Sequence, residues 1–432
     1  MAHRNFVAKF SFLLAALALL VGGLVAAPAK AAGKVTINIW TFGNVIEPKM
    51  KARYEKMHPN VKIVATNKGG PDQLAQALIV AFQAHKTPDI AAIETSWSGL
   101  FRDYPKNFVD LRSAPYKANK LKKNYVAWRW AQGTGKNGEV IGLPTDVGGL
   151  EVAYRVDLFK KAGFKTSREA VGRMWPTWDK FIEVGKTYNK RMKRCVEKSK
   201  TKSCFIDSSG TIFQAVLNQG TEKFYKAPGK VDYQNRQVRA AFNQTGKALT
   251  AGIGSRIAPY TGDWYAGMNK GTFATLLAPA WQLDYIKQYA PKTKGKWDVA
   301  RVPGGGGNIG GSQLTIPKAA PNKAEAWKFL SWYLAPAQQL TVFKEYGLFP
   351  STKVLYAKPA IQNYRDKFFR NAPIGRIYAA GALKLKPIYE GPKERAIMSI
   401  YGQALGRIEA KKQNTSQAWN QAVSDIHTAL SR

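Results

Sequence analysis

The chain contains few cysteines, few histidines and few acidic residues. Only two cysteines, Cys195 and Cys204, occur among its 432 residues, in the basic segment KRCVEKSKTKSCF. Their long spacing, without a histidine nearby, argues against a metal site. In an oxidising compartment the pair predicts a disulfide that closes a short loop, and two free thiols are the alternative.

The shortage of histidine argues against most hydrolase chemistries. Only His58, His85 and His427 follow the N-terminal segment, and each stands singly on a predicted helix end or face. The sequence has no G-x-S-x-G or H-E-x-x-H motif and no histidine placed to activate a serine. A glycosidase needs only two carboxylates, so a secreted glycosidase stays open as an alternative. Otherwise the sequence predicts no enzyme, no metal and no cofactor.

Acidic residues are outnumbered more than two to one. Lysine and arginine number 66 against 28 aspartates and glutamates, which gives a net charge of +38 at pH 7. Such a charge attracts polyanions, but the basic residues are spread along the whole chain and no nucleic-acid-binding motif accompanies them. We therefore expect a solvated basic surface and no nucleic-acid partner. An acidic or phosphorylated ligand is the alternative.

The N-terminus has the pattern of a secretory signal. Arg4 and Lys9 precede a long apolar core, and Ala29-Lys30-Ala31 supplies a cleavage site of the A-x-A type. We expect residues 1–31 to be removed. Because no cysteine lies at the cleavage site, the bacterial lipoprotein route is closed. The sequence thus predicts an exported, non-lipidated protein of the periplasm.

Strands and helices alternate over the first part of the mature chain. The segments 35–40, 61–66 and 88–94 are rich in β-formers and short enough for strands. Between them, apolar residues recur at helical spacing over 46–57 and 71–82. This order predicts a parallel sheet that is covered on both sides, and ligands bind such sheets beyond the carboxyl ends of the strands.

Five segments carry a resemblance to a known family. They are TPDIAAIETSWSGLF, GLPTDVGGLEVAYRVDLFKKAGF, WPTWDKFIEVGK, GDWYAGMNKGTFATLLAPAW and GGSQLTIPKAAPNKAEAWKFLSWYLAP. In their order and spacing they resemble the extracellular solute-binding proteins of family 1, the sugar-binding proteins of ABC importers that include maltose- and trehalose-binding proteins. The likeness extends over most of the mature chain.

The resemblance implies a two-lobe α/β fold of the type II periplasmic binding proteins. Each lobe would hold a mainly parallel sheet flanked by helices, with the ligand in the cleft between lobes. We place lobe 1 at residues 33–147 plus 299–336 and lobe 2 at 148–298 plus 337–432. The resemblance also implies a monomer that captures a sugar or oligosaccharide by hinge closure and delivers it to ABC-transporter permease subunits in the membrane.

Nine residues are candidates for the ligand site. An indole ring packs on the apolar face of a sugar, while carboxylates and amides bind the hydroxyls at its edge. Trp281 follows a predicted strand that ends at Pro279, and we favour ligand contact over a core position. The full set is Trp40, Asn44, Glu94, Trp97, Asp146, Trp264, Trp281, Gly310 and Gly311.

Several of these candidates have a structural alternative. Glu94 could cap a helix, although we favour ligand contact, and Asp146 could be a turn residue. Trp40 could end its strand in the core, and Trp264 is as plausible in a helix-start staple as in the site. Gly310 and Gly311 would bring backbone N–H groups to a ligand or form a bulge. Two further residues, Trp128 and Trp130, are more typical of a core.

The glycine-rich run RVPGGGGNIGGS does not predict a phosphate site. It lacks the G-x-x-x-x-G-K-[ST] order that phosphate-binding loops require. We interpret it as a flexible connection into the strand that returns to the first lobe.

Overall fold

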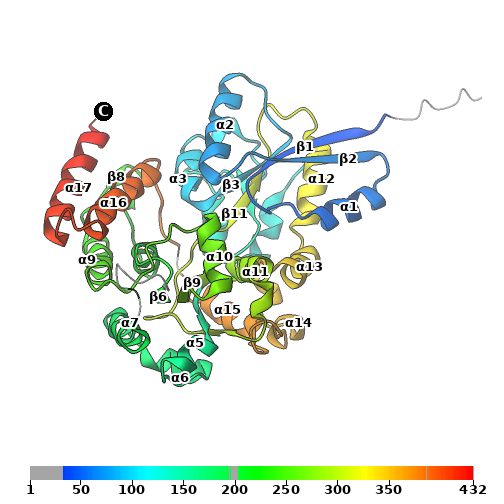
Figure 1. The fold of residues 1–432 in the computed structure, drawn as a ribbon. Helices are drawn as coiled ribbons and strands as arrows, with labels where there is room; N and C mark the ends of the chain where they lie inside the picture. Colours follow the sequence, from blue (N-terminus) through cyan, green and yellow to red (C-terminus); the bar gives the residue numbers. More distant parts are fainter. Residues whose placement is uncertain (1–32, 194, 196–202, 386, 432) are drawn as a thin grey trace, which may run out of the picture.

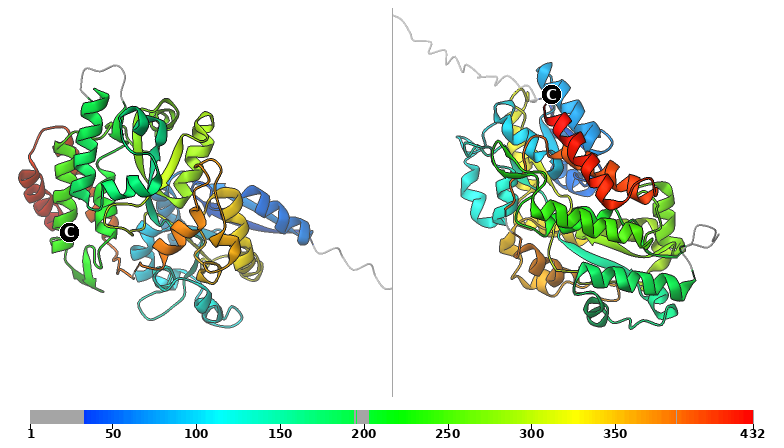
Figure 2. Two further views of the ribbon diagram at one scale, coloured as in Figure 1. Left: turned by 90° about the horizontal axis from the view of Figure 1, so that it is seen from below. Right: turned by 90° about the vertical axis from the view of Figure 1, so that its left-hand side faces the viewer.

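The computed structural model describes residues 33–193, 195, 203–385 and 387–431 (Figure 1). The predicted signal segment lies outside the described residues. Two lobes, each built on its own sheet, and a cluster of helices beside them make up the fold (Figures 1 and 2).

The first lobe holds a five-stranded sheet with the order β2-β1-β3-β11-β4. The first three strands are parallel, whereas β11 is antiparallel to both of its neighbours. All strands but β11 therefore run in one direction, in agreement with the predicted mainly parallel sheet. The bounds are β1 (Val35–Thr41), β2 (Val61–Asn67), β3 (Ile90–Glu94), β4 (Gly142–Pro144) and β11 (Ser312–Thr315).

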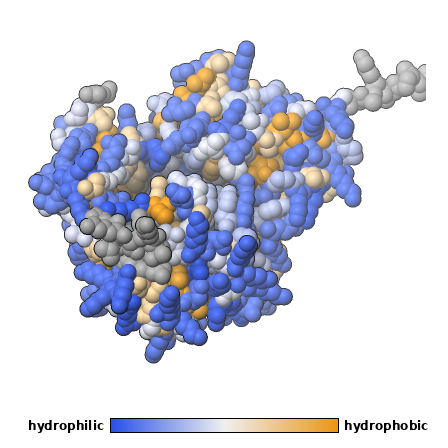
Figure 3. Space-filling model, in the orientation of Figure 1, coloured by the Kyte–Doolittle hydropathy of each residue, from blue (hydrophilic) through white to orange (hydrophobic). Residues whose placement is uncertain are grey.

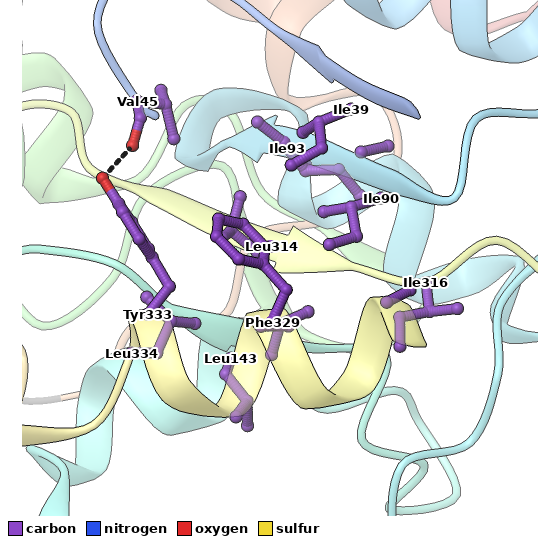
Figure 4. Close-up of a cluster of buried hydrophobic side chains, with 14 of the residues drawn as sticks. Ile39, Val45, Ile90, Ile93, Leu143, Leu314, Ile316, Phe329, Tyr333 and Leu334 are labelled. Carbon is purple, nitrogen blue, oxygen red and sulfur yellow. Dashed lines mark hydrogen bonds between the residues drawn. The ribbon is translucent and has the colours of Figure 1, made fainter. Parts of the chain in front are cut away.

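Helices cover this sheet, and two of them, α1 (Pro48–Met57) and α2 (Pro71–Gln83), lie where the apolar periodicity predicts. The others include α3 (Thr95–Asp103), α4 (Ala127–Gln132) and α12 (Lys323–Tyr333). In the lobe 1 core, Leu314 of β11 lies among isoleucines of β1 and β3 and faces Phe329 of α12 (Figure 4). Tyr333 of α12 donates a hydrogen bond of 2.9 Å to the carbonyl of Val45, which fixes the loop that follows β1.

The second lobe holds a four-stranded sheet with the order β10-β5-β9-β6. Here β5 is antiparallel to β10 and β9, and β9 is parallel to β6. Every residue of β5 and β9 is buried, as expected for strands covered on both faces. The bounds are β5 (Leu150–Arg155), β6 (Cys204–Ile206), β9 (Phe273–Pro279) and β10 (Trp297–Ala300).

One predicted lobe boundary is wrong. We placed the return to lobe 1 at residue 299, but this position lies inside β10, which pairs with β5 in the second sheet. The chain rejoins the first sheet only at β11. The family-like segment GGSQLTIPK marks that strand correctly, whereas the preceding β10 has no feature that assigns it to either lobe.

Helices of the second lobe flank its sheet and join it to a helical cluster. The flanking helices are α5 (Val156–Lys161), α6 (Arg168–Met174), α7 (Trp178–Met192), α10 (Gly262–Lys270), α11 (Ala280–Tyr289), α14 (Pro359–Gln362) and α15 (Ile374–Ala382). The helix α13 (Pro336–Tyr346) packs against the cores of both lobes. The helical cluster has its own core and consists of α8 (Thr211–Asn218), α9 (Arg236–Thr250), α16 (Glu394–Glu409), α17 (Thr415–Leu430) and the hairpin of β7 (Tyr225–Ala227) and β8 (Lys230–Val231).

Three chain segments cross between the lobes side by side. The N–H of Val147 donates to the carbonyl of Phe349, and the N–H of Ile309 donates to the carbonyl of Gly148, both at 2.8 Å. A Cβ atom on Gly148 would lie 1.9 Å from the carbonyl oxygen of Ile309, so only glycine permits this approach. These crossings are the natural position for a hinge.

The predicted disulfide is confirmed. Cys195 and Cys204 are bonded, and Cys204 begins β6, so the bond ties the end of the α7 region to the second sheet. Hydrophilic residues cover most of the face seen in Figure 3. Within the described part of the chain, no helix is long and apolar enough to cross a membrane.

Candidate functional site

A cavity of about 630 Å³ lies between the two lobes. Residues that follow the carboxyl ends of β1, β3 and β9 line it, as do the crossing segments. The carboxyl ends of the strands are where open α/β sheets bind their ligands. Six of the nine candidate residues line this cavity: Asn44, Glu94, Asp146, Trp281, Gly310 and Gly311.

Lobe 1 contributes a mostly polar wall. Asn44 is exposed in the loop after β1, and Glu47 follows it at the N-cap of α1. The Glu47 side chain is only 3 % exposed and makes no capping hydrogen bond. Burial, together with the charges of Asp284 and Glu345, raises the pKa of Glu47 to about 8.

Glu94 caps a helix and also lines the cavity. Its carboxylate caps α3, accepting hydrogen bonds from the N–H of Ser96 at 2.8 Å and from the hydroxyl of Thr95 at 2.7 Å. The same residue lines the cavity. The helix end therefore fixes the orientation of a carboxylate at the ligand site.

Lobe 2 contributes an aromatic wall around Trp281, which lies in the first turn of α11. The Trp281 indole N–H donates to the carbonyl of Ile309 at 3.0 Å, so a crossing segment fixes the ring. Tyr285 meets this ring edge to face, with centroids 5.6 Å apart. Tyr265 lies 6.2 Å from Tyr285, and all three rings line the cavity. Such preordered rings offer a flat apolar surface to a ligand.

Tyr260 extends the aromatic wall in an unusual conformation. Its backbone is left-handed, with φ +67°, and its side chain is 52 % exposed although its ring lies 6.3 Å from that of Trp281. A non-glycine residue in this region is strained and is frequent at functional sites. The conformation keeps an exposed ring at the cavity edge.

The crossing segments form the floor of the cavity. Asp146 accepts a hydrogen bond from the N–H of Ser312 at 3.2 Å, and burial raises its pKa. The buried guanidinium of Arg129 donates to the backbone carbonyls of Asp146 and Ser312. Gly310 has φ +77°, and a Cβ atom there would lie 3.1 Å from the indole nitrogen of Trp281.

A buried ion cluster borders the cavity beside the helical cluster. Lys223 contacts the Glu390 carboxylate and lies 3.7 Å from that of Glu394. Burial alone would lower the pKa of Lys223, but the two carboxylates raise it above its ordinary value. Both oxygens of Glu394 lack a hydrogen-bond partner, and burial raises its pKa.

Trp97 does not line the cavity, in contrast to our prediction. Its indole N–H donates to Asp72 at 2.9 Å, and Asp72 also accepts hydrogen bonds from Arg395 of α16. Both Asp72 and Arg395 line the cavity. Trp97 thus positions the Asp72 carboxylate, which forms an ion pair between α2 and α16.

Trp40 and Trp264 are also not cavity residues. Trp40 packs against the lobe 1 core, and Lys68 lies 4.0 Å above its ring. Trp264 is fully buried in lobe 2, where its N–H donates to buried Asp207 at 2.8 Å. Trp40 thus has the core position that the sequence left open, whereas Trp264 is a core residue inside α10 (Gly262–Lys270). Trp128, expected in the core, is 6 % exposed but does line the cavity.

The described residues contain no group of three or more histidine, cysteine, aspartate or glutamate side chains that could hold a metal. The cavity is instead equipped for hydrogen bonding and stacking. Residues that the sequence did not single out supply much of it, including Glu47, Asp72, Lys223, Tyr260, Tyr265, Asp284, Tyr285, Glu390, Glu394 and Arg395.

Comparisons with known proteins agree with this architecture. The family model described as "Bacterial extracellular solute-binding protein" matches residues 49–368. A lactose-binding protein of Rhizobium radiobacter is 26 % identical over 339 residues, which cover 73 % of this chain and 73 % of that protein.

Solved structures of solute-binding proteins are also similar to this chain. A crystal structure of an "Extracellular solute-binding protein family 1" superposes with a TM-score of 0.79 at 32 % identity and covers 91 % of this chain and 99 % of that chain. An ABC-transporter-associated binding protein from B. animalis subsp. lactis, in complex with β-1,6-galactobiose, gives a TM-score of 0.74 at 22 % identity. Here 92 % of this chain and 98 % of that chain are covered.

Proposed function

Because this chain belongs to the bacterial extracellular solute-binding proteins, we propose that it binds a sugar or oligosaccharide in its interlobe cavity for an ABC-type importer. The observation that carries this proposal is the pairing of an aromatic wall around Trp281 with a polar wall from lobe 1. A sugar ring has apolar faces and hydroxylated edges, and this cavity offers a surface for each.

The mechanism is hinge closure about the three crossing segments. A ligand that touches both lobes gains all of its contacts only when they are closed, so binding shifts the population toward the closed form. The closed form then docks on permease subunits in the membrane. In this mechanism the protein itself hydrolyses neither ATP nor the sugar, in keeping with a family of binding proteins.

Further parts of the proposal concern location and assembly. The signal-like N-terminus supports export to the periplasm, and the lack of a cysteine at its end supports a free rather than lipidated protein. Both walls of the cavity come from the same chain, so we propose that a monomer is sufficient for binding. The dispersed basic residues support a solvated surface and no nucleic-acid partner.

The test is a thermal-shift screen of the purified mature protein against neutral oligosaccharides, with the ligand recovered and examined by chromatography. A ligand at a hundred times its Kd adds about 2.7 kcal/mol to stability, which is readily detected. A stabilising oligosaccharide recovered intact supports the proposal. Cleavage products would instead identify a glycosidase, and no stabilisation by any carbohydrate would contradict the proposed ligand class.

A further inference from the structure

The cavity reverses the charge balance of the chain. Basic residues outnumber acidic ones 66 to 28 in the sequence, but seven acidic residues and only two basic residues line the cavity. Placement without regard to the ligand would give mostly basic lining residues. The reversal therefore indicates a ligand that a negative field attracts.

The two basic residues in the lining are already occupied. Arg395 is paired with Asp72, and Lys223 is shared by the Glu390 and Glu394 carboxylates. An anionic ligand would therefore have to displace existing ion pairs. The cavity is thus unsuited to the acidic or phosphorylated ligand that the basic composition suggested.

Glu47 and Asp284 face the cavity, and within the part of the chain that the structure describes neither carboxyl is paired with a basic side chain. Glu47 comes from lobe 1 and is 3 % exposed, and among the described residues its carboxylate has no hydrogen-bond or ion-pair partner. Asp284 comes from α11 of lobe 2, and the nearest compensating charge, Lys287, is itself paired with Asp366 at 2.6 Å. Two acidic groups from opposite lobes are thus left for the ligand.

The unsatisfied buried atoms of the cavity point the same way. Among its lining residues, the buried side-chain atoms without a hydrogen-bond partner are the oxygens of Asn218, Asn308, Glu394 and Tyr346. Except for the Tyr346 hydroxyl, all of these are acceptors unless Glu394 is protonated. A ligand rich in hydrogen-bond donors satisfies them, so the cavity as a whole favours donors over acceptors.

We infer that the ligand is an amine-bearing saccharide whose ammonium group lies between Glu47 of lobe 1 and Asp284 of lobe 2. This inference rests on the proposed carbohydrate-binding function and narrows its substrate class. The ammonium would bridge two carboxylates that otherwise repel one another across the cleft, so it would also favour closure. The raised pKa of Glu47 is consistent with an acid that lacks its cationic partner.

The experiment compares matched β-linked disaccharides and tetrasaccharides of glucose and galactose, each as the hydroxyl, free 2-amino and N-acetylated 2-amino form. Calorimetric titrations are made near pH 7 in two buffers of different ionisation enthalpy. Because the pKa of Glu47 is about 8 without ligand, binding of an ammonium group should release a proton from this carboxyl, and the two buffers reveal that release. We expect at least one amine form to bind at least about tenfold more tightly than its two neutral counterparts, as a desolvated charge pair commonly provides.

Variants link such a preference to the two carboxylates. Glu47→Gln and Asp284→Asn should each bring the ratio of amine to hydroxyl affinity close to one. Glu183→Gln is the matched control, because its side chain is 59 % exposed on α7 and outside the cavity lining. It should keep the wild-type ratio. Melting temperatures without ligand show whether each variant is folded.

Three results would overturn the inference. If a hydroxyl form binds as tightly as its amine counterpart, the amine is not recognised, but the carbohydrate-binding proposal stands. If no amine form binds, the inference also fails, and the neutral oligosaccharide screen decides separately whether the proposed function survives. A preference that persists in both Glu47→Gln and Asp284→Asn would remove these residues from the ammonium site.

Discussion

The two walls of the cavity differ in chemistry and in how they are held. On lobe 1, Asn44 presents an amide from the loop after β1, whereas Glu47 and Glu94 present carboxyl groups at the N-caps of α1 and α3. On lobe 2, Trp281 and Tyr285 lie on a single helix, α11, and pack against each other. One wall thus offers directional hydrogen bonds, and the other offers a flat apolar surface.

This difference suggests a division of labour in recognition. A rigid aromatic wall binds any ligand with an apolar face, so it contributes affinity with little selectivity. Hydrogen-bonding groups reject a ligand that lacks the matching partner, because they are then left buried and unsatisfied. We therefore expect substitutions of the aromatic residues on lobe 2 to weaken all ligands alike. Substitutions of the hydrogen-bonding groups, including Asp284 on α11, should change which ligand is preferred.

The largest effect is expected for the aromatic wall. Trp281→Ala should lower affinity at least about tenfold for every oligosaccharide that binds, since a central stacked aromatic residue commonly carries that much. Calorimetric titration measures the loss. Trp327→Ala is the control, because Trp327 packs on Tyr116 at the lobe 1 core and is not among the cavity-lining residues. Equal losses in the two variants would contradict a special role for Trp281.

A somewhat smaller effect is expected for Gly310, which lies in the crossing segment that contacts the Trp281 ring. Gly310→Ala places a Cβ atom 3.1 Å from the Trp281 indole nitrogen at a φ of +77°. The ring must shift or the backbone must relax, and an affinity loss of about fivefold corresponds to roughly 1 kcal/mol of such strain. Gly381→Ala is the control, since nothing lies within 4 Å of its added Cβ. Wild-type affinity in Gly310→Ala would show that the ring position is not critical.

The buried carboxyl of Glu47 should make the stability of the protein depend on pH. In the folded protein the pKa of Glu47 is raised from 4.5 to about 8 by burial, Asp284 and Glu345. The folded state then holds the proton more tightly than the unfolded state, so the free energy of unfolding falls as pH rises from 4.5 to 8. In Glu47→Gln the free energy of unfolding should decrease less over this pH range than in the wild type. The difference should be at least about 1.4 kcal/mol, the equivalent of one pKa unit.

Thermal melts of the ligand-free protein between pH 5 and pH 8 check this prediction. Glu183→Gln should keep the wild-type slope, because Glu183 is largely exposed on α7. A Glu47→Gln profile parallel to that of the wild type would mean that this carboxyl titrates normally in the folded protein.

The smallest effect is expected for the ion pair between α2 and α16. Asp72 and Arg395 are 48 % and 42 % exposed, so solvent screens their attraction, and exposed pairs contribute at most about 1 kcal/mol. Asp72→Asn should therefore weaken binding by less than about fivefold, with a larger deficit at low salt than at high salt. Calorimetry at two ionic strengths measures this. A loss that does not depend on salt would assign Asp72 to direct ligand contact.

Local patterns predicted the parts of the site that belong to strand ends. Glu94 and Trp281 follow strands whose composition and punctuation by proline are visible in the sequence, and both line the cavity. The same reasoning favoured Trp97, which donates its indole N–H to Asp72 and is not among the cavity-lining residues. For Trp264, which precedes its strand, nothing nearby in sequence reveals that Asp207 receives its indole N–H in the core. Strand ends identify the region, but only packing decides which way a side chain points.

Other parts of the site depend on contacts between distant residues. Lys223 and Glu390 are far apart along the chain and meet only because the helical cluster packs beside the lobes. Tyr260 reaches the cavity through a left-handed backbone that its residue type does not predict. The acidic character of the cavity was likewise hidden by the overall basic composition.

The central claim is that the interlobe cavity binds a carbohydrate against the Trp281 wall. Its most direct test is a calorimetric titration of wild-type and Trp281→Ala protein with an oligosaccharide that stabilises the wild type. The account predicts one-to-one saturable binding that weakens at least about tenfold in the variant. Undiminished binding by the variant, or no saturable binding by the wild type, would contradict it.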